Sequence, residues 1–375
     1  MNTIEDLRAA LDYPDQPASP DTGAIIARGR RRRTVRRAAV AGGLAAVVAT
    51  VVAVNPFGGG PELRQGMALD GTAPAPALIA AAGTGVEEAP ERFDPLMRTL
   101  HIGWVPGGLR GGSAEVSVTE QSFGAKDKDW ADGGTDLGLF LVVLAKGRPI
   151  TDFSDGALGL PMGAVERETE DINGRPAVCL SDPAVRGSCP ALRWEYAPGA
   201  WARVSYGGSA GPTPEAAAAV ARKVAESVWL TAAEPVRLPF TLTGATADLP
   251  AVRTFVSIAE PGYPDYEGQV WSASIAVAQT AAEAEKPPGE RRQVSFEARK
   301  SVDPGSRMRA DPEPNATVGG HDAWVADTEM IVWNVSGTRA VTWYENWDAD
   351  PRTAYADLRM IKDPADPADW PVVKR

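Results

Sequence analysis

A cluster of arginines followed at once by an uncharged, apolar segment constrains the fold of this chain most strongly. Seven arginines lie between positions 28 and 37, and residues 38–54 ("AAVAGGLAAVVATVVAV") carry no charge. As a helix this segment would span about 25 Å, slightly short of a hydrocarbon core of roughly 30 Å, and long arginine side chains can reach the interface. The sequence therefore predicts one transmembrane helix over 38–54, with the lipid bilayer as its partner.

The position of the arginines sets the orientation of this helix. All seven precede it, so the positive-inside rule places the N-terminus in the cytoplasm and the bulk of the chain outside the cell. Two export routes remain open as alternatives: a secretory signal cleaved after Val54, and a twin-arginine signal using Arg36 and Arg37. A buried helix of a soluble domain is disfavoured, because a core helix gains nothing from such a charge cluster.

The charge distribution argues against nucleic acid as a partner. The formal net charge is −11, and residues 1–37 hold eight arginines against five acids, or +3, which leaves −14 for residues 38–375. A large acidic body repels phosphate backbones. We therefore expect no nucleic-acid partner.

Composition and internal similarity divide the rest of the chain. The sequence predicts a cytoplasmic head over 1–37 and a flexible linker rich in Gly, Pro and Ala over 55–92. Two extracytoplasmic repeats follow, over 93–232 and 233–375. "FDPLMRTLHIGWVPGG" resembles "AEPVRLPFTLTGATAD", "INGRPAVCL" resembles "VGGHDAWVA", and "LRWEYAPGAWARVSY" resembles "IVWNVSGTRAVTWYE". Matched residues in these pairs are Pro95 with Pro235, Gly174 with Gly320 and Trp194 with Trp333. The constant order of the matches predicts a tandem repeat.

Alternating apolar and polar residues predict strands in both repeats. "SAEVSVTEQ", "QVWSASIAVA" and "RQVSFEA" suit half-buried strands, and "LGLFLVVLA" suits a strand buried on both faces. A helix should follow Thr213 as its cap and Pro214 at its first position, with a shorter counterpart over 352–361. The predicted fold class is α+β: two tandem related domains, each an antiparallel sheet packed on a C-terminal helix, after one transmembrane helix.

The two cysteines predict a structural disulfide. Cys179 and Cys189 flank a turn-like segment, "LSDPAVRGS", in what reads as a hairpin. Outside the membrane such a pair favours a bridge, and a redox-active pair would need closer spacing. Free buried thiols are the alternative.

Candidate catalytic residues are few. "GGSAG" centres a G-x-S-x-G match on Ser209, but Pro212 and Pro214 delay the helix that a nucleophile elbow requires, and a triad would have to recruit His321 from the other repeat. His101 and His321 are the two histidines of the chain, too few for a multi-histidine zinc site. We therefore expect no catalytic residues, no metal and no cofactor, and keep an exported serine hydrolase using Ser209 as the alternative.

Tryptophans in the strand hairpins are the candidate binding residues. Trp194 and Trp201 lie in the first repeat, and Trp333 and Trp343 in the second. Such rings can stack against a sugar or a peptide of the cell envelope, and core packing explains the same placement equally well.

The layout resembles a group of actinobacterial single-pass membrane proteins of unknown function. The shared features are a short head, an arginine cluster, an Ala/Val-rich span, a linker and repeats that end in "INGRPA" or "VGGHDA" followed by a tryptophan hairpin. Related exported domains are often attached to anti-sigma factors, but residues 1–37 lack the His and Cys-x-x-Cys of a zinc-type anti-sigma head. We expect a non-enzymatic envelope protein that binds or senses a ligand or protein partner, with signalling through the head as a further alternative.

Overall fold

The computed structural model describes residues 48–49, 88–127, 138–149, 165–181, 189, 191–207, 212–259, 269–302 and 311–373. The predicted head (1–37) and most of the predicted span and linker lie outside these ranges. All described residues belong to one unit that begins at Gly43.

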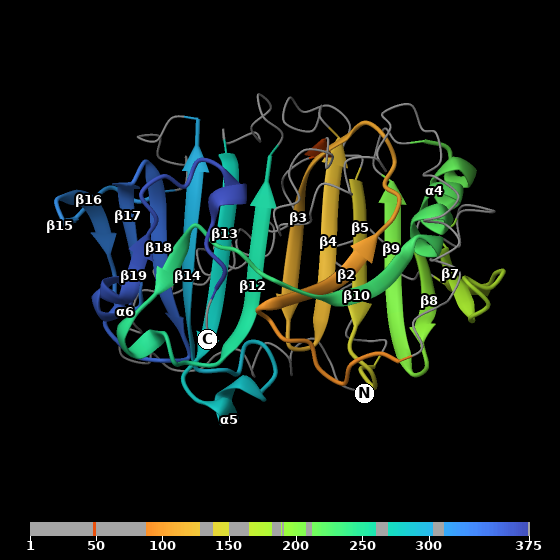
Figure 1. Cartoon of the computed structure of the whole chain (residues 1–375), viewed down its shortest axis with the longest axis horizontal. Helices are drawn as coiled ribbons and strands as arrows, with labels where there is room; N and C mark the ends of the chain where they lie inside the picture. Colours follow the sequence, from red (N-terminus) through yellow and green to blue (C-terminus); the bar gives the residue numbers. More distant parts are fainter. Residues whose placement is uncertain are drawn as a thin grey trace, which may run out of the picture. The chain divides into compact units, whose positions relative to one another are not determined.

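A 15-stranded sheet forms the body of the protein (Figure 1). Fourteen strands follow one another by hydrogen bonding in the order β15-β16-β17-β18-β14-β13-β12-β3-β4-β5-β9-β8-β7-β6, and every pairing in this series is antiparallel. The strands of the first half are β3 (Leu109–Ser117), β4 (Glu120–Asp127), β5 (Gly138–Leu144), β6 (Val165–Glu168), β7 (Ala177–Ser181), β8 (Ala191–Ala197) and β9 (Ala200–Gly207). Those of the second half are β12 (Ala251–Ile258), β13 (Gln269–Ala278), β14 (Gln293–Ser301), β15 (Ala316–Val318), β16 (His321–Val325), β17 (Glu329–Val335) and β18 (Thr338–Glu345).

The two halves meet at β3 and β12. These strands pair over six residues, from Arg253 opposite Ser117 to Ile258 opposite Gly112. The sequence predicts two separate sheets, whereas the structure joins them into one, because the first strand of each half has a free edge that the other half fills. Outward from this junction, both halves place their strands in the same relative order.

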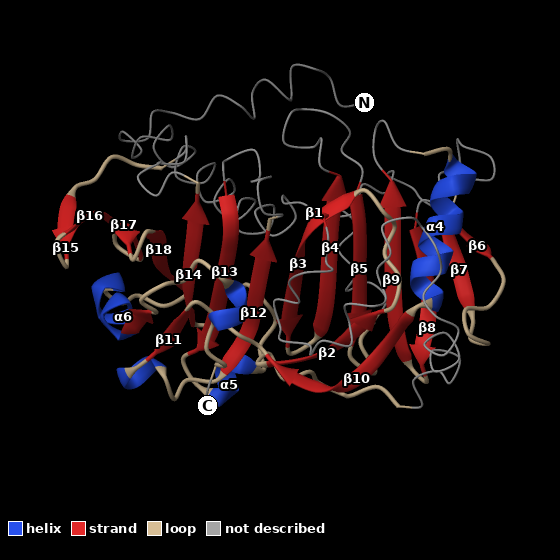
Figure 2. Cartoon of the chain, turned by 45° about the horizontal axis from the view of Figure 1, so that its top comes forward, coloured by secondary structure: helices blue, strands red, loops and turns tan. Residues whose placement is uncertain are grey.

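Two short two-stranded ribbons lie outside the large sheet (Figure 2). β2 (Met97–Ile102) pairs with β10 (Val228–Pro235), and β11 (Phe240–Leu242) pairs with β19 (Leu358–Met360). Gln121 of β4, 1% exposed, ties the first ribbon to the sheet, because its side-chain oxygen accepts hydrogen bonds from the backbone N–H groups of Thr99 and Leu100 at 3.1 and 2.9 Å. The boundary predicted between residues 232 and 233 lies inside β10.

Two of the helices, α4 (Pro214–Glu226) and α6 (Pro351–Asp357), cover the same face of the sheet as the ribbons. α4 packs on β8 and β9, and α6 packs on β17 and β18; α5 (Ala281–Ala284) and the 3₁₀ turns η5 (Gly244–Thr246) and η6 (Pro367–Asp369) are shorter. The predicted cap of α4 is confirmed, since the Thr213 hydroxyl accepts from the N–H of Ala216 at 3.4 Å and Pro214 occupies the first turn. The helix predicted over 352–361 ends earlier, at Asp357, because its last residues form β19.

The hydrophobic core lies between the sheet and these covering elements. We call the covered side the inner face and the opposite side the outer face. Leu141 of β5, Val204 of β9 and Phe296 of β14 point to the inner face and are fully buried. β5 is also buried on its outer side at Val142 and Leu144, as its continuous apolar sequence predicts.

The C-terminal segment is held in this core by Trp370. Its ring is fully buried and packs edge-on against Trp271 of β13, with ring centroids 5.1 Å apart. Its backbone oxygen accepts a hydrogen bond from Arg237 at 2.8 Å. The turn-rich end of the sequence is therefore a structural part of the second half.

The described residues contain no helix that is long and apolar enough to cross a membrane. Within the predicted span 38–54, Val48–Ala49 form the two-residue strand β1, which pairs in parallel with β3 at Arg110. The other residues of that span lie outside the described ranges.

Candidate functional site

The four tryptophans singled out from the sequence do not form one site. Trp194 of β8 points to the inner face, is 2% exposed and belongs to the main core. Trp201 of β9 points to the outer face, where it packs on Val142 and Leu144 and lies 5.6 Å from the Arg193 guanidinium, measured to the ring centroid. Trp333 and Trp343 lie together on the outer face of the second half.

A third tryptophan joins Trp333 and Trp343. Trp324 of β16 packs on the same apolar cluster, whose centre is the cross-strand pair Ile331 and Val341. We call these five residues the tryptophan patch. Three neighbouring strands, β16, β17 and β18, each supply one indole to it. Trp324 was not among the candidate binding residues chosen from the sequence, although its position in a strand next to a glycine turn was a usable signal.

A one-residue difference in alignment separates Trp194 from Trp333. Each tryptophan lies in a strand that leads into a tight turn. The turn contains a glycine with φ +71°, which is Gly199 in the first half and Gly337 in the second. Aligned on these glycines, Trp333 corresponds to Glu195 rather than to Trp194. Because alternate strand residues face opposite sides, this single step places Trp194 in the core and Trp333 on the outer face.

Hydrogen bonds to carboxylates fix two of the three indoles. The Trp333 N–H donates to Asp311 Oδ2 at 3.2 Å, and the Trp343 N–H donates to Glu345 Oε1 at 3.2 Å. Trp333 is 5% exposed, whereas Trp324 and Trp343 are half-buried and present part of each ring to solvent. The patch is therefore a rigid aromatic surface with two accessible rings.

Charged groups border the patch in compensated pairs. Arg339 donates to Asp311 Oδ1 at 2.7 Å, so this carboxylate holds both Arg339 and Trp333. Arg299 of β14 forms an ion pair with Glu297 on its own strand. Burial lowers the pKa of Arg339, the charge of Arg299 lowers it further, and Asp311 and Glu297 oppose both effects.

Two carboxylates are neighbours of Trp343 on the outer face. Glu329 of β17 is its direct cross-strand partner, and Glu345 is two residues further along β18 on the same face. Both side chains are half-buried. The accessible ring of Trp343 is thus flanked by hydrogen-bond acceptors.

Of the residues considered for catalysis, the two histidines lie on separate elements. Ser209 lies outside the described residues. His321 is on β16 near the end of the sheet, and His101 is on β2 in a separate ribbon, stacked on Trp229 with ring centroids 4.2 Å apart. Burial lowers the pKa of His101, the charge of Arg98 lowers it further, and Glu234 opposes this. The described residues contain no group of three or more His, Cys, Asp or Glu side chains that could hold a metal ion.

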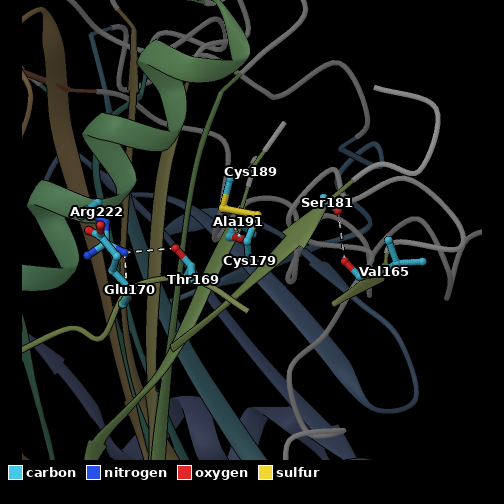
Figure 3. Close-up of a disulfide and its surroundings, with 8 residues drawn as sticks. All are labelled: Val165, Thr169, Glu170, Cys179, Ser181, Cys189, Ala191 and Arg222. Carbon is cyan, nitrogen blue, oxygen red and sulfur yellow. Dashed lines mark hydrogen bonds between the residues drawn. A yellow bond between two sulfur atoms is a disulfide. The ribbon is translucent and has the colours of Figure 1, made fainter. Parts of the chain in front are cut away.

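The predicted disulfide is confirmed. Cys179 of β7 and Cys189 are bonded across the β7–β8 hairpin, with Cα atoms 5.4 Å apart (Figure 3). Both cysteines line a pocket of about 330 Å³ between α4 and the edge of the sheet that β6 and β7 form. The other lining residues are Arg167, Glu168, Thr169, Leu192, Ala218, Ala219 and Arg222.

Comparisons with known proteins do not assign this chain to a family. No protein-family model matches the chain, and no curated protein matches it. A weak likeness links it to the crystal structure of MucB in complex with MucA(peri), with a TM-score of 0.20, 12% sequence identity, and coverage of 76% of this chain and 96% of that one. A TM-score this low carries no inference about fold or function.

Proposed function

We propose that this protein is a non-enzymatic binding protein of the cell envelope, anchored in the membrane by residues 38–54, whose tryptophan patch binds a glycan chain. The observation that carries the proposal is the gathering of three indoles on one face by three adjacent strands. Aromatic rings held in place before binding lose little conformational entropy when a ligand packs on them.

The chemistry around the patch favours a sugar polymer. A sugar ring has an apolar face that can pack on the accessible rings of Trp324 and Trp343, and hydroxyl groups that can donate to Glu329 and Glu345. These two carboxylates place negative charge at the patch border, so they disfavour an anionic ligand. The ligand we propose is a neutral, hydroxyl-rich glycan.

The size of the patch favours an extended ligand. The accessible rings belong to Trp324, which pairs with Ile331 of β17, and Trp343, which pairs with Glu329 two residues earlier on β17. With strands about 4.8 Å apart and roughly 3.3 Å per residue, these two tryptophans lie about 12 Å apart across the sheet. A chain of several sugar units would cover this length, whereas a single monosaccharide would contact one ring at a time.

We also propose that the two halves arose by duplication and that the bulk of the chain lies outside the cell. The identical relative strand order of the two halves supports the duplication. The arginine cluster before residue 38 supports the orientation. A helix over 38–54 and the pairing of Val48–Ala49 with β3 exclude each other, so the anchored form would lack β1.

Binding to insoluble chitin, a neutral sugar polymer, tests this function. Full-length protein in detergent should sediment with the chitin, and Trp343→Ala and Trp324→Ala should each weaken the association by about tenfold. Trp104→Ala is the matched control, because Trp104 is also half-buried but lies beside α4, with Lys223 4.0 Å from its ring centroid. Equal binding by all three variants and the wild type would refute the proposal.

The anchor is tested separately by fractionation of cells. The full-length chain should remain in the membrane fraction after carbonate washing, and external protease should digest the region from residue 93 onward. A variant without residues 38–54 should leave the membrane fraction. Retention of this variant would show that the predicted span is not the anchor.

A further inference from the structure

The disulfide packs at the border of the core and also lines an open pocket. Both sulfur-bearing residues line the cavity between α4 and the β6–β7 edge, together with small side chains of the helix, Ala218 and Ala219. Cys179 is 7% exposed and Cys189 is half-buried. A cavity of about 330 Å³ is large enough to admit a small molecule to the sulfur atoms.

Two arginines line this pocket, Arg167 and Arg222, and Arg222 also pairs with Glu226, whose Oε1 lies 3.5 Å from its Nη1. Arg167 of β6 is the direct cross-strand partner of Cys179, so both side chains project from the same face of the sheet into the pocket lining. Arg222 of α4 donates to Thr169 Oγ1 at 3.2 Å and to the backbone oxygen of Glu170 at 2.8 Å, which fixes it at the pocket wall (Figure 3). Glu168 is the single carboxylate among the described lining residues, so the described lining has a net charge of +1.

The two sulfurs have different surroundings. Cys179 is the cross-strand partner of Arg167, a positively charged residue that favours a thiolate on its neighbour. Cys189 Sγ lies 3.5 Å from the carbonyl oxygen of Ala191, a position in which a reduced thiol can donate its S–H. Cys179 is therefore the better leaving group, and the half-buried Cys189 is the more accessible sulfur for attack.

We propose that this pocket is a thiol–disulfide exchange site for small anionic thiols. The thiolate of the incoming molecule attacks Cys189 Sγ, a new S–S bond forms, and the bond between Cys189 and Cys179 breaks. The electron pair leaves on Cys179 as a thiolate next to Arg167. A second thiolate then attacks the external sulfur of the mixed disulfide, and Cys189 leaves and takes a proton from water. The incoming thiol is oxidised to its disulfide, and the protein pair is reduced.

Three small thiols of different charge test the proposal on the folded full-length chain. The probes are 2-mercaptoethanesulfonate, 2-mercaptoethanol and 2-aminoethanethiol, which are anionic, neutral and cationic. Each rate of disulfide reduction is divided by the rate of the same thiol with a small neutral disulfide, which removes intrinsic reactivity. We expect the normalised rate of the anionic thiol to exceed that of the cationic thiol by about tenfold.

Arg167→Gln should abolish most of this charge preference. Arg352→Gln is the matched control, because it removes one positive charge from a side chain that is 57% exposed and lies on α6, in the second half of the protein. Arg222 is not replaced, since its hydrogen bonds hold the segment around Thr169 and its loss would disturb the fold. Equal normalised rates for the three thiols in the wild type would overturn the proposal.

Trapping of the intermediate tests the direction of attack. Reaction with limiting 2-mercaptoethanesulfonate, followed by alkylation of free thiols with iodoacetamide and peptide mass spectrometry, should find the added thiol on Cys189 and the alkyl group on Cys179. If the added thiol is found on Cys179 and the alkyl group on Cys189, the proposed roles of attacked sulfur and leaving group are wrong. Reduction that occurs only after urea unfolds the chain would show that the disulfide is purely structural.

Discussion

Arg299 of β14 and Arg339 of β18 are direct cross-strand partners on the outer face, and a carboxylate compensates each of them. Like charges in this position repel each other, so the pair depends on Glu297 and Asp311. The side chain of Asp311 is 4% exposed and also accepts the Trp333 N–H. This carboxylate therefore connects the ion pairs of the outer face to the tryptophan patch.

Replacement of Asp311 should destabilise the second half strongly. Asp311→Ala leaves the buried Arg339 without its carboxylate and next to Arg299, so we expect the free energy of unfolding to fall by about 3 kcal/mol. Urea unfolding followed by circular dichroism measures this loss. Arg352→Ala, which breaks the exposed Arg352–Asp350 pair with side chains 57% and 53% exposed, should cost less than about 1 kcal/mol. Comparable losses in the two variants would contradict this account of Asp311.

A side chain at Gly244 should be poorly tolerated. Gly244 has φ +57°, and a Cβ atom there would overlap the carboxylate of Asp357, whose Oδ2 accepts from the N–H of Thr246 at 3.1 Å. Gly244→Ala should therefore lower the free energy of unfolding by about 3 kcal/mol. Gly289→Ala is the control, because Gly289 also has a positive φ, +89°, but a Cβ atom there would meet no neighbouring atom within 4 Å. Its expected cost is about 1 kcal/mol, and an equal cost at both glycines would exclude the steric contribution of Asp357.

His101 should make stability depend on pH in the mildly acidic range. Its pKa in the folded chain lies below the ordinary value of 6.5, so the unfolded chain binds the proton more readily. The contribution of neutral His101 to the free energy of unfolding is therefore complete above pH 6.5. It is lost as the pH falls from 6.5 toward the lowered pKa of the folded chain. His101→Phe keeps a ring against Trp229 but cannot titrate, so its urea midpoint should fall less than that of the wild type between pH 7.5 and pH 5. If the urea midpoint of His101→Phe falls as far as that of the wild type, the pH dependence belongs to other groups.

The disulfide should stabilise the chain by a limited amount. The bonded cysteines are 10 residues apart, and closure of so small a loop is worth about 3 kcal/mol in the chain-entropy account. The double variant Cys179→Ser/Cys189→Ser should lose that amount in urea unfolding, and fully reduced wild type should lose the same. A loss in reduced wild type much smaller than in the double variant would show that the serines themselves disturb the hairpin.

Local features of the fold could be predicted from the sequence. The positions of β3, β13 and β14, the buried character of β5, the Thr213 cap of α4 and the bridge between the two cysteines each follow from residues close together in the chain. The half-buried character predicted for β13 is wrong, because the strand is buried on both faces in the middle of the large sheet. Such features depend on side-chain period and backbone chemistry, which a short window of sequence contains.

Long-range features could not be predicted in the same way. The pairing of β3 with β12 joins segments about 140 residues apart, between Val116 and Thr254 for example, and neither strand carries a signal for its partner. Whether Trp333 points to the inner or the outer face depends on a shift of one residue in the alignment of the two repeats at the turn that contains Gly337. The weak sequence similarity of the repeats does not fix that register. The Arg167–Cys179 juxtaposition likewise depends on which strand pairs with β7.

Fluorine NMR of protein labelled with 5-fluorotryptophan tests the proposed glycan site most directly. Each of the chain's 11 tryptophans gives one signal, which single Trp→Phe variants assign. On titration with chitohexaose, a neutral sugar chain, we expect the signals of Trp324, Trp333 and Trp343 to shift together and saturably. The signals of Trp271 and Trp370, both buried in the core, should stay unchanged. Shifts confined to tryptophans outside the patch, or no saturable shift with chitohexaose or with soluble sacculus fragments, would contradict the account.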